Sequence, residues 1–224
     1  SEKALLYVLR SKGLIIASNF TNCAAPVLIG SIGSSKLTVR DSLFENCKPK
    51  HSCVTADVHG YAEIHDCMFT NTISKDSVIS SERNSNILIN TSVFESSWSP
   101  AILLSASAAN VRNSSFRDSF AEGKRSVLGD KSTLNMKWCN FYDSSLGGLI
   151  LNSGRNKLRE LTFNTTRERS IPNSLQLMCI DCKFIEVHET AEYDKQAIIV
   201  TLICAIVASS FAMFGKDHLY VIMR

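Results

Sequence analysis

The chain has 224 residues, a formal net charge of +3 and 20% charged residues, so it lacks the concentrated basic charge that nucleic-acid binding requires. Its hydrophobic residues form short runs between stretches rich in Ser, Asn and Thr. This texture is typical of many short strands joined by polar turns and not of long helices.

Phenylalanine recurs at near-constant intervals through most of the chain. The successive intervals are 24, 25, 25, 22, 25, 22 and 21 residues, and they separate Phe20, Phe44, Phe69, Phe94, Phe116, Phe141, Phe163 and Phe184. Internal repeats of this length indicate a solenoid.

The residues around each Phe form columns that identify the type of solenoid. An apolar residue stands five positions before each Phe, and mostly small residues stand two before it and three after it, with polar residues between. This alternation predicts strands with one inward and one outward face. Helical repeats would show apolar steps of three and four, and a leucine-rich repeat would show a leucine and asparagine frame. We therefore predict an all-β protein, a right-handed parallel β-helix of about eight coils over residues 1–187.

The repeats resemble those of the chlamydial polymorphic membrane proteins and of similar surface proteins in single-celled eukaryotes, in which a Phe is followed closely by Asn and then by a Gly-Gly-apolar strand. The matching stretches are FTNC at 20–23, FENC at 44–47, FTNT at 69–72 and NFYDSSLGGLIL at 140–151. The resemblance covers residues 14–187 and implies a β-helical surface protein. One coil carries the Gly-Gly pair, and no segment matches the outer-membrane barrel of the chlamydial proteins.

The two ends of the β-helix suggest what adjoins it. The stretch ALLYVL near the start resembles the second strand of a coil, so we expect the natural chain to extend upstream of Ser1. After a juxtamembrane linker at 188–196, residues 197–214 carry no charge and are long enough for a transmembrane helix. A buried core helix would normally have a polar face. Residues 215–224 would then form a short cytoplasmic tail.

The cysteines and the glycosylation motifs indicate the cellular compartment in which the protein resides. Cys23 and Cys47 occupy the same column of consecutive coils, which makes them a candidate disulfide, while Cys47 with Cys53 is a competing pair and free buried thiols are the alternative. The single C-x-x-C motif, Cys179 and Cys182, falls on inward columns and indicates structural burial. N-glycosylation motifs occur at Asn19, Asn90, Asn113 and Asn164, of which Asn90 and Asn113 are expected at coil corners, where a glycan could project outward. With the membrane segment, they predict a single-pass protein of the plasma membrane or another secretory-pathway membrane, with the β-helix on the extracellular or lumenal side.

A basic stripe is the most distinctive outward feature of the sequence. The column four residues before each Phe contains Arg40, His65, Arg112, Lys137 and Arg159. Like charges on adjacent strands repel each other, so this stripe is a candidate site for an anionic partner such as an acidic glycan. The alternative is a solvated face whose charge is balanced by carboxylates such as Glu63 and Glu160.

Enzymatic chemistry finds little support in the sequence. Recurring aspartates such as Asp41, Asp66, Asp118, Asp143 and Asp181 fall at turn columns, where local backbone hydrogen bonds explain them. No motif indicates a metal or cofactor site. We predict a non-enzymatic surface protein that serves recognition, adhesion or assembly with other membrane proteins, and no nucleic acid. The alternatives are a polysaccharide-active β-helix enzyme and an accessory subunit of a channel or transporter.

Overall fold

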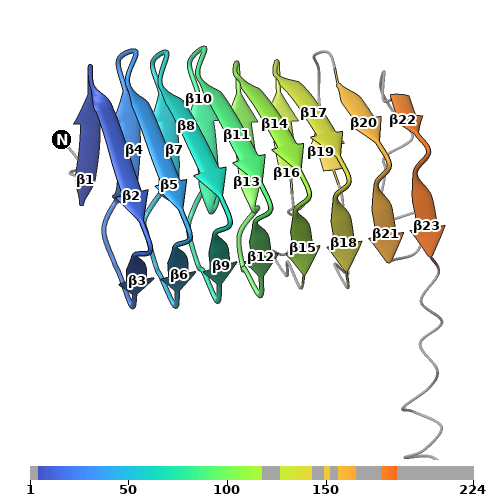
Figure 1. The fold of residues 1–224 in the computed structure, drawn as a ribbon, viewed down its shortest axis with the longest axis horizontal. Helices are drawn as coiled ribbons and strands as arrows, with labels where there is room; N and C mark the ends of the chain where they lie inside the picture. The colour runs from blue at the N-terminus through green and yellow to red at the C-terminus, as the bar shows by residue number, and fades with distance from the viewer. Residues whose placement is uncertain (1–4, 118–126, 143–148, 152–155, 165–177, 186–224) are drawn as a thin grey trace, which may run out of the picture. The chain divides into compact units, whose positions relative to one another are not determined.

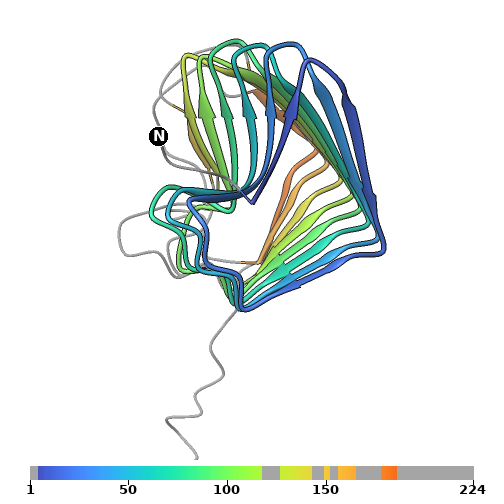
Figure 2. The same cartoon turned by 90° about the vertical axis from the view of Figure 1, so that its left-hand side faces the viewer.

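A computed structural model describes residues 5–117, 127–142, 149–151, 156–164 and 178–185. They form three parallel sheets that wind around one hydrophobic core, and each coil up to β21 contributes one strand to each sheet, while β22 and β23 extend sheets B and C (Figures 1 and 2). The parallel β-solenoid predicted from the repeats is confirmed. The chain divides into two units, Ser1–Glu186 and Val187–Arg224, and the predicted linker, transmembrane helix and tail lie outside the described residues.

The strands of each sheet follow one another in chain order. Sheet A consists of β1 (Leu6–Leu9), β4 (Val27–Ile32), β7 (Ser52–Asp57), β10 (Ile79–Glu82), β13 (Ile102–Ser105), β16 (Val127–Asp130) and β19 (Leu149–Leu151). Sheet B consists of β2 (Lys12–Ile16), β5 (Lys36–Arg40), β8 (Tyr61–His65), β11 (Asn86–Asn90), β14 (Ala108–Arg112), β17 (Thr133–Lys137), β20 (Lys157–Arg159) and β22 (Met178–Ile180). Sheet C consists of β3 (Asn19–Thr21), β6 (Leu43–Glu45), β9 (Met68–Thr70), β12 (Val93–Glu95), β15 (Ser115–Arg117), β18 (Asn140–Tyr142), β21 (Thr162–Asn164) and β23 (Lys183–Ile185).

The repeated phenylalanines form one continuous stack inside sheet C. Neighbouring rings from Phe20 to Phe163 are nearly parallel, with centroids 4.6 to 5.0 Å apart. The stack follows from the register, which places Phe44 opposite Phe69 and Phe94 opposite Phe116 in adjacent strands. Because each ring covers its neighbours, the Phe side chains from Phe44 to Phe163 are fully buried.

The turn between sheets B and C explains two columns of the repeat. The residue three before each Phe has a left-handed backbone, with φ between 49° and 56°, which Asp and Asn tolerate better than most residues. The small residue next to it closes the corner: the Ser42 hydroxyl donates to the Arg40 carbonyl at 2.7 Å, and the Ser18 backbone amide donates to Ser42 Oγ at 3.2 Å. A residue without a hydroxyl or thiol in that column, such as the buried Leu161, cannot make these bonds.

The turn after sheet C accounts for the Asn of the F-x-N motif. Asn22, Asn46 and Asn71 follow their Phe by two residues and have φ values of 54°, 52° and 50°. Asn is favoured there because its short polar side chain stabilises the left-handed conformation locally. This motif is therefore accounted for by backbone geometry.

Candidate functional site

Alternate residues of sheet B point out of the solenoid and form a broad outward face. In β14, Ala109 and Val111 are buried whereas Asn110 and Arg112 are exposed, and β17 repeats this alternation. The cations on this face are Lys12, Lys36, Arg40, Arg112, Lys137, Lys157 and Arg159. We call it the basic face. Among the described residues of its strands, Glu63 is the carboxylate.

The predicted stripe lies along this face in strict register. Arg40 is opposite His65, Arg112 is opposite Lys137, and Lys137 is opposite Arg159 in neighbouring strands. Asn90 separates His65 from Arg112. Adjacent strands are about 4.8 Å apart, so Arg112, Lys137 and Arg159 form an uninterrupted row of three cations.

Of the two carboxylates expected to balance the stripe, Glu160 pairs with one of its residues, whereas Glu63 pairs with a lysine in another column. Glu63 pairs with Lys36 at 2.7 Å and accepts a hydrogen bond from Thr38 at 3.3 Å. Burial is the largest single effect and opposes ionisation of Glu63, but the Lys36 ammonium and the hydrogen bonds from Thr38 and Tyr61 together outweigh it and lower the pKa of the carboxyl. Glu160 lies 3.3 Å from the Lys137 ammonium. Within the described residues no carboxylate lies within ion-pair distance of Arg112, Lys157 or Arg159.

A shallow depression of about 280 Å³ lies on the basic face where these cations gather. Its polar lining consists of Asn110, Arg112, Asn135, Lys137, Lys157 and Arg159. The Asn135 amide donates to Asn110 Oδ1 at 3.1 Å, so the two asparagines are held in fixed orientations. The depression therefore offers amide and cationic hydrogen-bonding groups side by side.

Several residues of this site were not predicted from the sequence. Among them, Lys12, Lys36 and Lys157 lie in other outward columns of sheet B, and Trp138 lies at the corner that follows β17. Lys36 and Lys157 were identifiable, because they stand an even number of residues before the stripe column on the same strand. Trp138 had no such signal, since its column otherwise contains turn residues.

The thiols of Cys23, Cys47 and Cys53 form a cluster where the chain passes from sheet C to sheet A. Cys47 and Cys53 are buried, and Cys47 interacts with both other thiols. Its hydrogen bond with Cys53 lowers the pKa of Cys47 to about 6, against the opposing effect of burial. All three are free thiols in the structure, so the predicted bridge between Cys23 and Cys47 and the competing bridge between Cys47 and Cys53 stay predictions.

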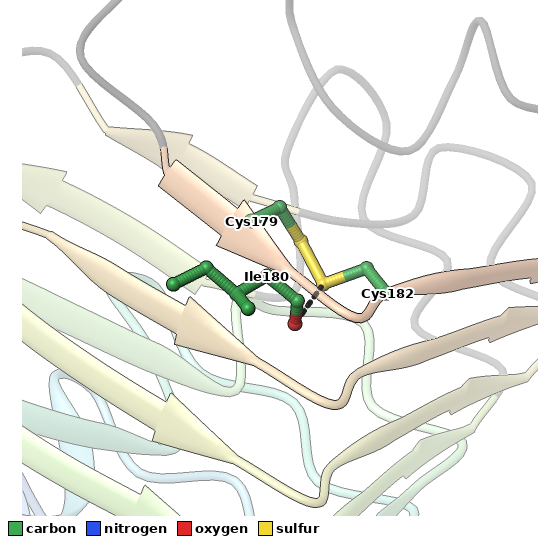
Figure 3. The surroundings of a disulfide bond; sticks show 3 residues. All are labelled: Cys179, Ile180 and Cys182. Atoms are coloured by element: carbon green, nitrogen blue, oxygen red, sulfur yellow. Dashed lines mark hydrogen bonds between the residues drawn. A yellow bond between two sulfur atoms is a disulfide. The ribbon is translucent and has the colours of Figure 1, made fainter.

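Cys179 and Cys182 form a disulfide with a Cα–Cα distance of 5.9 Å, where structural burial alone was expected (Figure 3). The corner at Asp181, with φ of 55°, brings the ends of β22 and β23 together. In earlier coils these two columns hold pairs such as Val39 and Ser42, which cannot form such a bond. The bond therefore closes the corner within a single coil.

The four N-glycosylation motifs have different environments. Asn19 and Asn113 are exposed, and Asn113 occupies a corner as expected. Asn90 was expected at a corner but is the last residue of β11, where its Oδ1 accepts a hydrogen bond from Asn113 Nδ2 at 3.3 Å. Asn164 is half-buried. Asn19 and Asn113 are therefore the better placed glycan acceptors.

The described carboxylates act mainly as turn and ion-pair residues. Asp41, Asp66 and Asp181 turn the corner between sheets B and C, whereas Asp118 and Asp143 lie outside the described residues. At the end of sheet A, the Asp57 carboxylate accepts two hydrogen bonds from Arg83, one of them at 2.6 Å from Nε. Among the described residues no group of His, Cys, Asp and Glu is arranged to hold a metal ion.

Glu82, in the coil after Asp57, provides a test of pH dependence. Burial, and then the negative charge of Asp57, raises the pKa of Glu82. A carboxyl group whose pKa is raised in the folded protein contributes stability at pH values below its pKa in the unfolded chain. This contribution is lost as the pH rises through the raised, folded-state pKa. We expect Glu82→Gln to raise the melting temperature at pH 7 and to leave it unchanged at pH 4. The control is Glu95→Gln, on the outer face of sheet C, and equal effects at both pH values would contradict the prediction.

Comparisons with known proteins complete the description of the site. No family model and no curated protein matches the chain. Among solved structures, the full-length plasmid-mediated fluoroquinolone resistance protein QnrB1 aligns with 12% identity over 85% of this chain and 99% of its own, with a TM-score of 0.21. A trypsin-treated R167E form of QnrB1 aligns with 8% identity over 88% of this chain and 97% of its own, also with a TM-score of 0.21. These similarities are too low to transfer a function.

Proposed function

We propose that this chain is a non-enzymatic recognition protein of a cell surface or secretory-pathway membrane, whose basic face binds an acidic partner. The observation that carries the proposal is the row of Arg112, Lys137 and Arg159 on successive strands, with Lys157 beside it. Stacking like charges costs free energy in the isolated protein. An anionic partner would remove that cost and gain charge-assisted hydrogen bonds.

The rigidity of the solenoid favours recognition. Neighbouring coils are hydrogen-bonded along the sheets, so the backbone holds the Cα positions of the outward residues at a fixed spacing. A fixed array loses little conformational entropy when it binds a partner. The proposed partners are acidic glycans and other membrane or surface proteins.

The finer features of the proposal come from the sequence. They are a right-handed β-helix related to the chlamydial surface repeats, and a membrane anchor at 197–214, which is uncharged over 18 residues. In the part of the chain that the structure describes, no helix is long and apolar enough to cross a membrane, and the anchor segment lies outside that part.

Charge reversal tests the basic face directly. We expect the whole chain to bind a sulfated glycan such as heparin, and the double variant Arg112→Glu, Lys137→Glu to weaken this binding by at least about tenfold, because two attractions become repulsions. The matched control is Lys131→Glu, which changes the charge outside the basic face. Binding should also weaken with rising salt. Unchanged glycan binding by the double variant would contradict the proposal.

A further inference from the structure

Trp138 occupies an unusual position beside the depression on the basic face. It lies at the corner after β17 with φ of 56°, in a column that contains Asp66, Asn113 and Glu160 in other coils. The left-handed turn is shared by every residue of this column, but Trp138 is the one aromatic side chain among them, and a bulky residue is unfavourable there. Its side chain is nonetheless 46% exposed, so burial in the core does not explain it.

Two neighbours hold the indole in place. The Lys137 ammonium lies 3.7 Å from the centroid of the Trp138 ring, and Trp138 Nε1 donates a hydrogen bond to the Glu160 carboxylate. Glu160 also pairs with Lys137, at 3.3 Å, so the three side chains brace one another. The hydrogen bond from Trp138 is the largest cause that lowers the pKa of the Glu160 carboxyl. The indole is thus fixed next to a residue that lines the depression.

We propose that Trp138 and the depression together form a binding site for one residue of an acidic glycan, that is, a sugar chain that bears carboxylate or sulfate groups. This inference rests on the proposed function and names the chemistry of its partner. The face of the indole that the Lys137 ammonium does not cover offers an apolar surface for the C–H face of a sugar ring. Asn110 and Asn135 would bind hydroxyl groups, and Arg112 and Arg159 would bind the acidic groups, for which the guanidinium fork is suited.

The surroundings favour a sugar over a nucleic-acid strand. A single strand is usually bound by a series of aromatic platforms that stack successive bases. In the same column the neighbouring coils have Asn113 and Glu160 in place of a second aromatic residue. A depression of about 280 Å³ that is lined by amides and cations, with a single indole at the residue after Lys137, instead fits one ring with polar substituents.

Tryptophan fluorescence provides a direct readout of this site. The chain contains two tryptophans, so the variant Trp98→Phe leaves Trp138 as the sole indole. We expect a saturable change in its emission when a heparin-derived octasaccharide is added to the whole chain, and none with a neutral oligosaccharide of equal length. Affinity is then measured by calorimetry for Trp138→Ala, where we expect a loss of about tenfold. Trp98→Ala, which removes the other exposed indole, is the matched control.

A second variant separates a binding role from a structural one. Glu160→Gln removes the negative charge that neutralises Lys137. If the site binds anionic ligands, this variant should bind the octasaccharide about two- to fivefold more tightly. A site in which Trp138 and Glu160 act only as a structural brace would instead lose affinity or stability in this variant.

The outcomes distinguish this inference from the proposed function. If the double variant Arg112→Glu, Lys137→Glu abolishes binding while Trp138→Ala has no effect, the basic face binds anions, but the inference that Trp138 binds a sugar residue is wrong. If a single-stranded oligonucleotide binds more tightly than the octasaccharide and depends on Trp138, the ligand class is wrong. If neither polyanion binds, the proposed function fails as well.

Discussion

Replacing Phe94 with Ala is expected to destabilise the solenoid by about 3–5 kcal/mol, the usual cost of removing a buried aromatic ring. Phe94 is fully buried, and its ring stacks on Phe69 and on Phe116 with centroids 5.0 Å away on each side. Its loss leaves a cavity in the middle of the stack and removes two ring contacts. Because each coil is stabilised mainly by its neighbours, the damage should extend to both flanking coils.

The measurement is urea and thermal unfolding of the whole chain, followed by far-UV circular dichroism. Phe20→Ala is the matched control, because Phe20 lies in the first coil, is only partly buried and stacks on one described ring, Phe44, at 4.7 Å. We expect the Phe20 variant to lose clearly less stability than the Phe94 variant, and Phe94→Leu to lie between them. Equal losses for Phe20→Ala and Phe94→Ala would show that position in the stack does not determine stability.

Replacing Gly60 with Ala should cost up to about 3 kcal/mol through overpacking. A Cβ atom at this buried position would lie 2.3 Å from the Ser31 carbonyl oxygen and 2.9 Å from its carbonyl carbon. It would also lie 3.0 Å from the Asp57 backbone nitrogen. These neighbours are backbone atoms of hydrogen-bonded coils, so they cannot move aside as a flexible side chain would.

The loss is measured as a fall in the midpoint of urea unfolding. Gly33→Asn is the control: Gly33 has φ of +67°, which Asn tolerates, and a Cβ there would be no closer than 3.8 Å to the Arg10 side chain. We expect this control to change stability by less than about 1 kcal/mol. A Gly60→Ala variant as stable as the control would mean that the turn before β8 relaxes without breaking its contacts.

The sequence by itself determined the type of fold and the direction in which most side chains point. The Phe repeat sets the length of each coil, so Phe69 and Phe94 must meet in adjacent strands. Strand alternation then places Arg112 and Lys137 outward in register, and the structure confirms both placements. These inferences succeed because a parallel stack makes spatial neighbours of residues that are one repeat apart.

Only the tertiary structure decided how the outward residues pair and where the surface is hollowed. Glu160 and Trp138 occupy the same corner column of adjacent coils, so the sequence makes them neighbours, but their hydrogen bond depends on the side-chain conformations at the corner between sheets B and C. The Cys179–Cys182 disulfide likewise depends on the sharpness of one corner. Column positions give the coil and the face of a residue, but the side-chain conformation at a corner depends on the backbone turn and on the side chains of the next coil.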